Sequence, residues 1–389
     1  MYTVYLKKNE EKDIINKRYF IFSNEVLKIE GHDSQGSVCR ILNSEKKFLG
    51  IGFINHLSKM IVKIISFSEE TVNYSFFYER IKKANERRLS RFTRDSYRVV
   101  FSDSDFLPGL IVDKYDDHLV ISISNLGMDL RKKLITDALI NIFNPKCIYE
   151  KSLSTIREKE GLKLVSGLLY GELNPNLVIS INNINYGVDI VNGQKTGYFL
   201  DQVDNRLEIS KYAKDRNVLD LFCNVGGFSL VAAAHGAKKV YAVDISEIAL
   251  EEVKKNALLN NISNIETINK DIFNYLTELK DRETKFDCIV LDPPAFIKTI
   301  DTIGKGYNGY LTINKNALKL LPENGILFTF SCSEHMSLDM FLKMINEASI
   351  AAKVNIKIIK ILTQSEDHII NLRVENSFYL KGLIVQLIN

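Results

Sequence analysis

The chain has 389 residues, of which 46% are hydrophobic and 25% charged, as in ordinary globular proteins. A formal net charge of +3 is too small to argue nucleic-acid binding, so such a surface needs a local cluster. The five cysteines form no CxxC pair, which argues against a zinc site or disulfide framework, and no uncharged apolar run reaches membrane length. We expect a cytoplasmic enzyme with reduced thiols, no metal site and no membrane contact.

Residues 1–74 are expected to form a small β domain. Short apolar runs between polar breaks predict strands at Val38–Leu42, Phe48–Ile54 and Met60–Ile65. Their spacing is typical of a small barrel. The phrases RYFIFSNEVLKIEG, FLGIGFINHLS and MIVKIIS resemble the PUA domain, an RNA-binding barrel. A packing module without a ligand is the alternative.

A basic segment follows at Phe77–Arg94, with seven basic and two acidic residues. Its intermittent apolar stripe predicts an amphipathic helix. Such a helix is a candidate surface for RNA phosphates, although a charge run is more often a solvated face. The candidate contacts are Arg80, Lys83, Arg87, Arg88 and Arg91.

This basic helix and a small α+β middle domain make up residues 75–176. Strands are predicted at Tyr97–Phe101, Leu110–Asp113 and Leu119–Ile123. A helix is predicted at Met128–Phe143, with one apolar face formed by Leu130, Leu134, Ala138 and Ile142. The segment contains no chemical constellation, so we expect a spacer or an RNA-facing unit.

From residue 177 to residue 389, strands alternate with helices, which implies a mainly parallel α/β sheet with helices on both faces. The stretch Asn217–Ser246 is interpreted as strand, glycine turn, helix and strand, with Asp244 at the tip of the second strand. Gly226 and Gly227 allow the backbone to approach a ligand closely. An ordinary βαβ unit is the alternative. The turn, DLFCNVGGF, is not a dinucleotide GxGxxG; it resembles motif I of class I S-adenosylmethionine (SAM) methyltransferases.

Four carboxylates, on Asp220, Asp244, Asp271 and Asp292, lie at or just after predicted strand ends. Ligands of open α/β sheets bind at the carboxyl ends of the strands. Together the four can satisfy the amino group, the ribose hydroxyls and the adenine amine of SAM, a cofactor without phosphate. The sequence DPP from Asp292 resembles the motif IV loop of methyltransferases that act on nucleobases.

A polar block at Gly193–Arg206, GQKTGYFLDQVDNR, precedes the glycine turn. It could close over a charged cofactor or a phosphate, or be only a loop and a helix cap. Its candidate side chains are Lys195, Thr196, Gln202 and Arg206.

Cys332 follows a predicted strand, Ile326–Phe330, at the edge where a cofactor is expected. C5 of cytosine is a poor nucleophile until a thiolate adds to C6, whereas methylation at nitrogen needs no thiol. Such a cysteine must be exposed and form a thiolate readily. A small buried residue is the alternative, and it is the interpretation we give to Cys223 and Cys288.

The phrases LPGLIVDKY, QKTGYFLDQVDNR, LDLFCNVGGFS, VLDPPAF, FSCSEHMS and YLKG, with DH at 367–368, resemble a family of large-subunit ribosomal RNA cytosine-5 methyltransferases with an N-terminal PUA domain. The resemblance implies a Rossmann-like methyltransferase domain at 177–389, methylation at C5 of a cytosine in 23S-type rRNA and Cys332 as nucleophile. We further expect Asp292 to hydrogen-bond the Watson–Crick edge of the flipped base. The implied cofactor residues are Lys195, Thr196, Gln202, Arg206, Asp220, Phe222, Gly226, Asp244, Ile245, Asp271, Ile272 and Asp292.

Two positions depart from the family pattern, because Val203 and Asn308 stand where arginine is expected. Their loss could weaken RNA contact or shift the substrate. His335 and His368 are more often structural than catalytic in such places. The rival functions are an rRNA guanine-N methyltransferase and a non-catalytic RNA-binding protein. A homodimer is among the expected assemblies.

Overall fold

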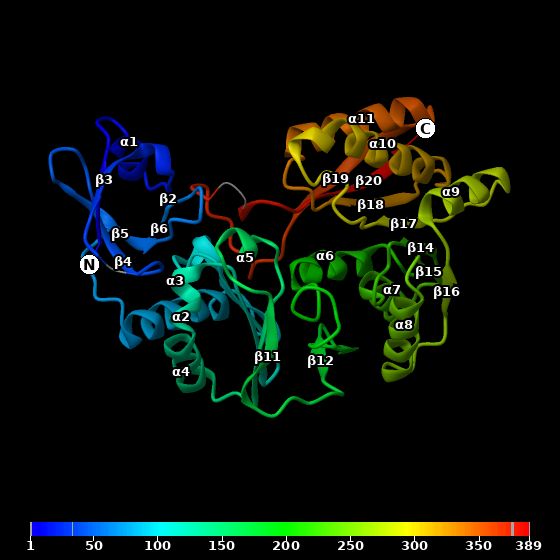
Figure 1. The fold of residues 1–389 in the computed structure, drawn as a ribbon. Coiled ribbons are helices and arrows are strands. Elements are labelled where there is room, and N and C mark those ends of the chain that lie inside the picture. The colour runs from blue at the N-terminus through cyan, green and yellow to red at the C-terminus, as the bar shows by residue number, and fades with distance from the viewer. Residues whose placement is uncertain (1, 33, 375–376, 389) are drawn as a thin grey trace. The chain divides into compact units, whose positions relative to one another are not determined.

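The computed structural model describes residues 2–32, 34–374 and 377–388, which divide into two compact units (Figure 1). The first unit holds Met1–Ile179, Val188–Leu200 and Glu366–Ser377. The second unit holds Ser180–Gly187, Asp201–Ser365 and Phe378–Asn389. Both units are therefore discontinuous in sequence, and two short later segments complete the first one.

The first unit begins with a six-stranded sheet in the order β2-β6-β5-β4-β1-β3. β1 pairs parallel with β4 and antiparallel with β3. The predicted strands are confirmed, the third with a shifted start. The bounds are β1 (Tyr2–Leu6), β2 (Phe20–Ile21), β3 (Val26–Glu30), β4 (Val38–Leu42), β5 (Phe48–Ile54) and β6 (Val62–Ser66), with α1 at Glu11–Ile15.

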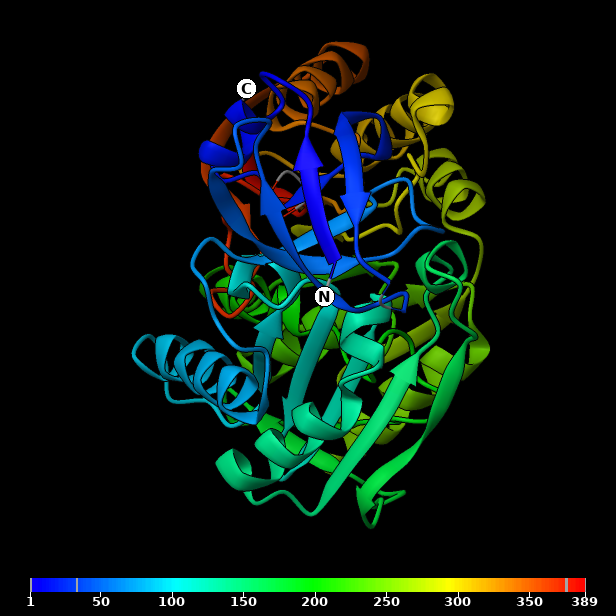
Figure 2. The same cartoon turned by 60° about the vertical axis from the view of Figure 1, so that its left-hand side comes forward.

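A second sheet of this unit has the order β11-β10-β9-β8-β7. Helices α2 (Tyr74–Leu89) and α4 (Lys132–Phe143) pack on it through a shared apolar core (Figure 2). The strands are β7 (Tyr97–Phe101), β8 (Leu110–Tyr115), β9 (His118–Ile123), β10 (Cys147–Ser152) and β11 (Val165–Gly171), and α5 spans Ile156–Lys159.

Two predicted helices differ from the structure. The helix predicted at 128–143 is two helices, α3 (Leu126–Asp129) and α4, and Leu130 between them is 59% exposed instead of facing the core. A Cβ on Gly127 would lie 2.1 Å from the Phe53 ring, so only a residue without a side chain lets α3 pack this closely on β5. The backbone leaves helical geometry at Arg131, with φ −109° and ψ 15°, which separates α3 from α4. The basic helix ends at Leu89, five residues earlier than predicted.

The second unit is built on a seven-stranded sheet in the order β16-β15-β14-β17-β18-β20-β19. The five strands from β16 to β18 are parallel, and β20 is antiparallel to both of its neighbours. Helices α7 (Gly227–Ala234) and α8 (Glu247–Leu259) cover one face (Figure 1). Helices α9 (Ile272–Asp281), α10 (Ile303–Lys319) and α11 (Leu338–Ala352) cover the other, which confirms the predicted α/β class. The strands are β14 (Asn217–Leu221), β15 (Lys239–Asp244), β16 (Ile265–Asn269), β17 (Cys288–Leu291), β18 (Ile326–Ser331), β19 (Asn355–Thr363) and β20 (Lys381–Ile388).

The carboxyl ends of the parallel strands meet at one edge of this sheet, where the predicted carboxylates follow. A hairpin of β12 (Val178–Ile181) and β13 (Ile184–Gly187) precedes it. Helix α6 spans Val203–Glu208. None of the described helices is both long enough and apolar enough to cross a bilayer.

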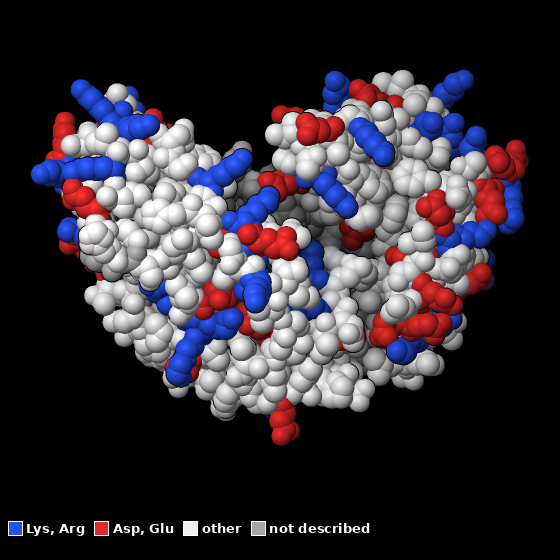
Figure 3. All heavy atoms as spheres, viewed as in Figure 1, with Lys and Arg blue, Asp and Glu red and all other residues white. Residues whose placement is uncertain are grey.

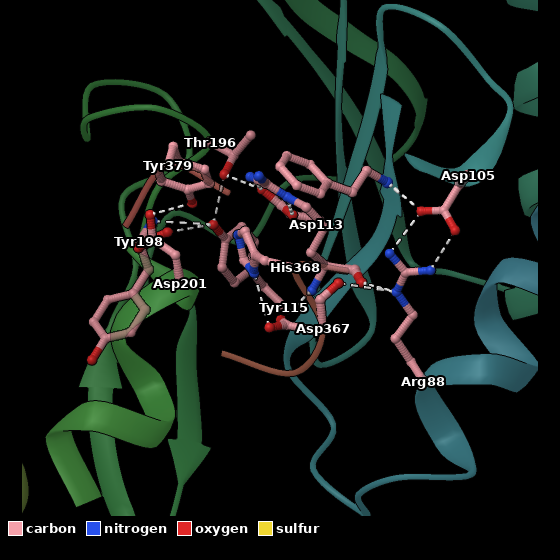
Figure 4. A network of polar contacts seen from close by, with 12 residues as sticks. Arg88, Asp105, Asp113, Tyr115, Thr196, Tyr198, Asp201, Asp367, His368 and Tyr379 are labelled. Carbon is pink, nitrogen blue, oxygen red and sulfur yellow. Dashed lines mark hydrogen bonds and ion pairs between the residues drawn. The ribbon is translucent and has the colours of Figure 1, made fainter. Parts of the chain in front are cut away.

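The segment Glu366–Ser377 is held inside the first unit by Asp367. Its carboxylate accepts from the Arg98 backbone N–H at 2.8 Å and pairs with Arg94 at 3.0 Å, while its carbonyl accepts from Arg88 Nε at 3.1 Å. Figure 4 shows Arg88 between this carbonyl and the carboxylate of Asp105. The returning segment therefore contributes buried partners that the N-terminal residues lack on their own.

Candidate active site

The turn between β14 and α7 has an unusual backbone. Phe222, Asn224 and Gly226 all have left-handed φ angles, of +63°, +49° and +84°. Such angles are costly for a bulky residue like Phe222 and are found mostly at functional sites. A Cβ on Gly227 would lie 2.3 Å from Arg206 Nε, so only glycine allows α6 and the start of α7 to approach this closely.

Asp220 is 1% exposed beside this turn. Its Oδ2 accepts from the backbone N–H and the hydroxyl of Ser229, at 2.9 and 2.6 Å. Its Oδ1 is buried and has no hydrogen-bond partner within the described part of the chain. Burial, together with the nearby charge of Asp292, raises the pKa of Asp220 to about 7. A buried acceptor of this kind fits the ammonium group of a ligand.

Asp244 and Asp271 occupy the two neighbouring strand ends. The Asp244 carboxylate accepts from the backbone N–H groups of Asn224 and Ser246, at 3.0 and 2.9 Å, so it is held against the glycine turn. Asp271 Oδ1 accepts from Asn274 N at 3.0 Å and caps helix α9. Both carboxylates remain solvent-accessible, as a ribose or adenine contact requires.

Asp292, directly after β17, is held by a short chain of side chains. Gln202 Nε2 donates to Asp292 Oδ1 at 2.8 Å, and Asn205 Nδ2 donates to Gln202 Oε1 at 2.7 Å. Both Gln202 and Asn205 are buried. The amide of the predicted cofactor residue Gln202 therefore orients a carboxylate.

The loops after β17 and β18 are joined by two residues that the sequence analysis did not single out. Tyr310 Oη lies 2.9 Å from Ser333 Oγ and 3.4 Å from Pro294 O. Ser333 Oγ also accepts from Ile297 N at 3.1 Å. The spacing SCS was visible in the sequence, but the partner Tyr310 comes from α10 and could not be paired with it. The junction fixes the DPP loop relative to the strand end that carries Cys332.

Cys332 differs from the other four cysteines in exposure. It is partly exposed, and its Sγ lies 3.7 Å from Pro293 O, whereas Cys39, Cys147, Cys223 and Cys288 are buried. Burial raises the pKa of Cys288 to about 12 and that of Cys223 well above its usual value, so neither forms a thiolate readily.

The two remaining loop candidates, Lys195 and Thr196, lie in the first unit. Lys195 Nζ lies over the Phe199 ring, 4.5 Å from its centroid. Thr196 is buried and its hydroxyl donates to Asp113 Oδ2 at 2.6 Å, next to Tyr115 (Figure 4). The Thr196 side chain therefore serves the packing of the first unit.

The structure contradicts one predicted RNA contact, Arg88. Its side chain is 0% exposed and forms two 2.7 Å hydrogen bonds to the buried carboxylate of Asp105, so it cannot reach a phosphate. Lys83, Arg87 and Arg91 are exposed. In sequence, Arg87 and Arg88 are equivalent members of one charge run, and only the fold separates them.

The surface over α2 carries both signs of charge. Arg80 pairs with Glu70 at 3.2 Å and Arg87 with Asp105 at 3.1 Å, and basic and acidic side chains are mixed over this part of the first unit in Figure 3. These pairs reduce the net positive charge offered to a phosphate. Among the described residues of this segment, three exposed basic side chains form no ion pair with a carboxylate: Lys82, Lys83 and Arg91.

The two histidines and the two positions that depart from the family pattern lie in different surroundings. His368 is buried in the first unit, where Nδ1 lies 2.9 Å from Asp367 Oδ1, a structural role, and His335 is half-buried next to the SCS loop. Val203 is buried at the start of α6, so its departure from arginine concerns packing. Asn308 is exposed on α10, where an arginine could have contacted RNA.

In the described ranges, no three His, Cys, Asp or Glu side chains form a potential metal site.

Two apolar residues complete the predicted cofactor set. Ile245, directly after Asp244, is 69% exposed, and Ile272, directly after Asp271, is 3% exposed. An exposed isoleucine beside Asp244 is an apolar surface that fits an adenine ring. The orphaned Oδ1 of Asp220, the strained glycine turn and the two accessible carboxylates together fit a ligand with an ammonium, a ribose and a base.

The fold and this site define the class. A family model described as S-adenosylmethionine-dependent methyltransferase matches residues 164–356, and one for a PUA-like domain matches residues 4–67. A protein described as a SAM-dependent methyltransferase from Streptococcus mutans has the same fold, with a TM-score of 0.83 and 23% identity over 99% of this chain and 100% of its own. A second methyltransferase structure, complexed with SAH, has a TM-score of 0.85 to this chain, with 23% identity and the same coverage of both chains. The protein is a SAM-dependent methyltransferase with an N-terminal PUA-like domain.

Relatives over the full length define the family. The chain is 39% identical to the ribosomal RNA large subunit methyltransferase I of Tolumonas auensis, covering 99% of both chains. It is also 39% identical to the protein of that name from Aeromonas salmonicida, covering 98% of both. The chain therefore belongs to the ribosomal RNA large subunit methyltransferase I family.

Proposed function

We propose that this protein transfers a methyl group from SAM to C5 of a cytosine in 23S-type ribosomal RNA, through a covalent adduct between Cys332 and C6 of the base. The observation that carries the proposal is the position of Cys332: it is the partly exposed cysteine, on a loop joined to the DPP loop by Ser333 and Tyr310. Full-length relatives named as large-subunit rRNA methyltransferases support the RNA substrate.

In this proposal the bound cofactor supplies an electrophilic methyl group. Asp220 accepts a hydrogen bond from the ammonium of its methionine part. Asp244 accepts hydrogen bonds from the ribose hydroxyls, and Asp271 accepts one from the adenine amine. Gly226, Phe222 and Ile245 shape the backbone and the apolar wall, with Ile272 behind them. Arg206, which lies against Gly227 at the start of α7, is a further cofactor contact.

On the substrate side, Cys332 Sγ adds to C6, which makes C5 electron-rich enough to accept the methyl group. Asp292 hydrogen-bonds the Watson–Crick edge of the flipped cytosine while N3 becomes protonated. After transfer, the C5 proton goes to water and its bonding electrons re-form the C5–C6 double bond. The S–C6 bond breaks with its electrons returning to sulfur, and N3 gives up the proton that it gained. Gln202 keeps Asp292 in place for this contact through its 2.8 Å hydrogen bond.

The first prediction concerns the adduct. With 5-fluorocytidine in the target RNA, the fluorine cannot leave as a proton does, so the wild-type enzyme should be trapped on the RNA. Cys332→Ala should form no adduct and transfer no methyl group, while binding SAM normally. The measurement is a denaturing gel of enzyme with fluorinated RNA, together with a nuclease digest that separates 5-methylcytidine from methylguanosine.

Cys223→Ala is the matched control, because Cys223 lies in the same unit but is 5% exposed, and this variant should still be trapped. An adduct that forms equally well with Cys332→Ala would remove the nucleophile assignment. A digest that contains methylguanosine would favour the guanine-N alternative.

Three further parts of the proposal concern the whole chain. Residues 1–74 act as an RNA-binding domain ahead of the middle domain at 75–176 and the methyltransferase domain at 177–389, and Arg80, Lys83, Arg87 and Arg91 contribute phosphate contacts. The protein acts in the cytoplasm, where ribosomal RNA is assembled into ribosomes.

The protein forms a homodimer, which sedimentation equilibrium of the full chain would measure; a monomer mass at all concentrations would exclude the dimer.

A further inference from the structure

Lys381 is a buried cation at the loop that carries Cys332. Its side chain is 1% exposed, and its Cα is paired with that of Ser331, the residue before Cys332. Its Nζ donates to the carbonyl of Ser333, the residue after Cys332, at 2.7 Å. The lysine thus touches the backbone on both sides of the cysteine.

The close packing of β20 on β18 explains how the lysine reaches this position. A Cβ on Gly382 would lie 2.5 Å from the Phe330 ring, so glycine lets the strand approach. The second hydrogen bond of Lys381 Nζ goes to Tyr379 O at 2.8 Å, which directs the amine toward the strand end.

Among the described residues no carboxylate forms an ion pair with Lys381, and the charge of Glu334 compensates its ammonium only in part. Its two acceptors are backbone carbonyls. Burial lowers the pKa of Lys381 to about 8, and the charges of Cys332 and Glu334 act in the opposite direction. A buried, unpaired ammonium costs stability, so its place here calls for another explanation.

We propose that Lys381 is a positioning residue for the nucleophile: its ammonium stabilises the Cys332 thiolate before it adds to the base and again when it leaves. This inference rests on the proposed function, in which Cys332 is the nucleophile. The thiol proton goes to water, and no bond to Lys381 forms or breaks.

The other ionisable groups around the loop do not serve this purpose. Tyr310 of α10 and Asp292 of the neighbouring loop are neutral or anionic, and so is Glu334, which is exposed. His335 is only half-buried, unlike Lys381, which is 1% exposed. Lys381 is the group here that combines burial with a positive charge at the pH of catalysis.

The test is the pH dependence of Cys332 alkylation by iodoacetamide in the full-length protein, followed by mass spectrometry of the Cys332 peptide. Only the thiolate reacts, so the midpoint reports the thiol pKa. In the wild type we expect a midpoint below about 8, under the value of about 8.5 for a free thiol. Lys381→Met, which keeps the length and apolar stem, should raise the midpoint by about one unit, or about tenfold less thiolate at neutral pH. Lys381→Arg should keep the low midpoint.

Lys357→Met is the matched control, an exposed lysine on β19 of the same sheet, and it should leave the midpoint unchanged. A wild-type midpoint at or above the free-thiol value overturns the inference without any variant. So does an unchanged midpoint in Lys381→Met, or in Lys381→Gln if the methionine variant loses its cooperative thermal transition. The alkylation profile needs no RNA: a shifted midpoint with no 5-fluorocytidine adduct would refute the proposed function alone, and the reverse result would refute only the role of Lys381.

Discussion

At the scale of single residues, Asp220 links proton binding to cofactor binding. Burial holds its pKa at about 7 in the protein without ligand. An ammonium group placed against its orphaned Oδ1 would favour the charged carboxylate, so the proton must leave before or during binding. The same residue opposes folding when it is charged and unpaired.

We predict that SAM affinity increases about tenfold between pH 6 and pH 8, because a group with a pKa near 7 is mostly protonated at the lower pH. Asp220→Asn should bind SAM more weakly at pH 8 and lose this dependence. Isothermal titration calorimetry at several pH values measures both. A flat pH profile in the wild type would contradict the ammonium assignment.

The sign of the stability effect follows from the same shift. Between the unfolded pKa of about 4 and the folded value of about 7, the folded state binds more protons than the unfolded state. The free energy of unfolding of the ligand-free protein should therefore fall as pH rises through this window. Asp220→Asn should remove this part of the slope in urea titrations.

At the scale of elements, helix α2 has two kinds of basic residue on one sequence pattern. Arg88 points into the first unit and pairs with Asp105, whereas Lys83 and Arg91 point to solvent. A buried pair that loses one partner leaves an uncompensated charge, while an exposed lysine contributes little to stability. The buried arginine thus anchors the helix in the first unit, whereas its exposed basic side chains are free to contact a partner.

We predict that Arg88→Ala lowers the free energy of unfolding by about 3–5 kcal/mol, because Asp105 stays buried without its main partner. The matched double variant Lys83→Ala with Arg91→Ala should change stability by less than about 1 kcal/mol, yet weaken RNA binding and flatten its salt dependence. Urea titration and filter binding at several salt concentrations measure the two effects. RNA affinity and salt slope that survive the double change would make α2 only a solvated face.

At the scale of the whole molecule, the discontinuous units make the chain ends interdependent. Asp367, from the C-terminal half, accepts from Arg98 N and pairs with Arg94 in the first unit. A fragment of residues 1–179 retains both arginines and lacks this carboxylate. Buried donors without partners are costly, so the fragment begins with a deficit that the full chain does not have.

We predict that the fragment 1–179 shows no cooperative unfolding transition at the melting temperature of the full chain. Full-length Asp367→Asn, which keeps the backbone and loses the charge, should melt at an intermediate temperature. Thermal unfolding followed by circular dichroism compares the three. A fragment that melts as the full chain does would show that the returning segment is dispensable.

The sequence by itself determined the class of the second unit and the chemistry at its strand ends. The strand, glycine turn and helix at 217–234 and the carboxylates after successive strands are local patterns. Apolar runs form buried parallel strands, and ligand-binding side chains follow the carboxyl ends of such strands. The partial exposure of Cys332 and the burial of Cys223 and Cys288 also agree with what the sequence predicted. These features depend on residues near one another in the chain.

The tertiary structure alone decided the roles of residues whose partners are distant. Arg88 is buried because Asp105 and Asp367, 17 and 279 positions away, meet it inside the first unit. Tyr310, Ser333 and Lys381 belong to different elements and come together only when α10, β18 and β20 pack. Charge runs and periodicity carry no information on which long-range partner compensates a buried group, because the cost of burial is set by the complete fold.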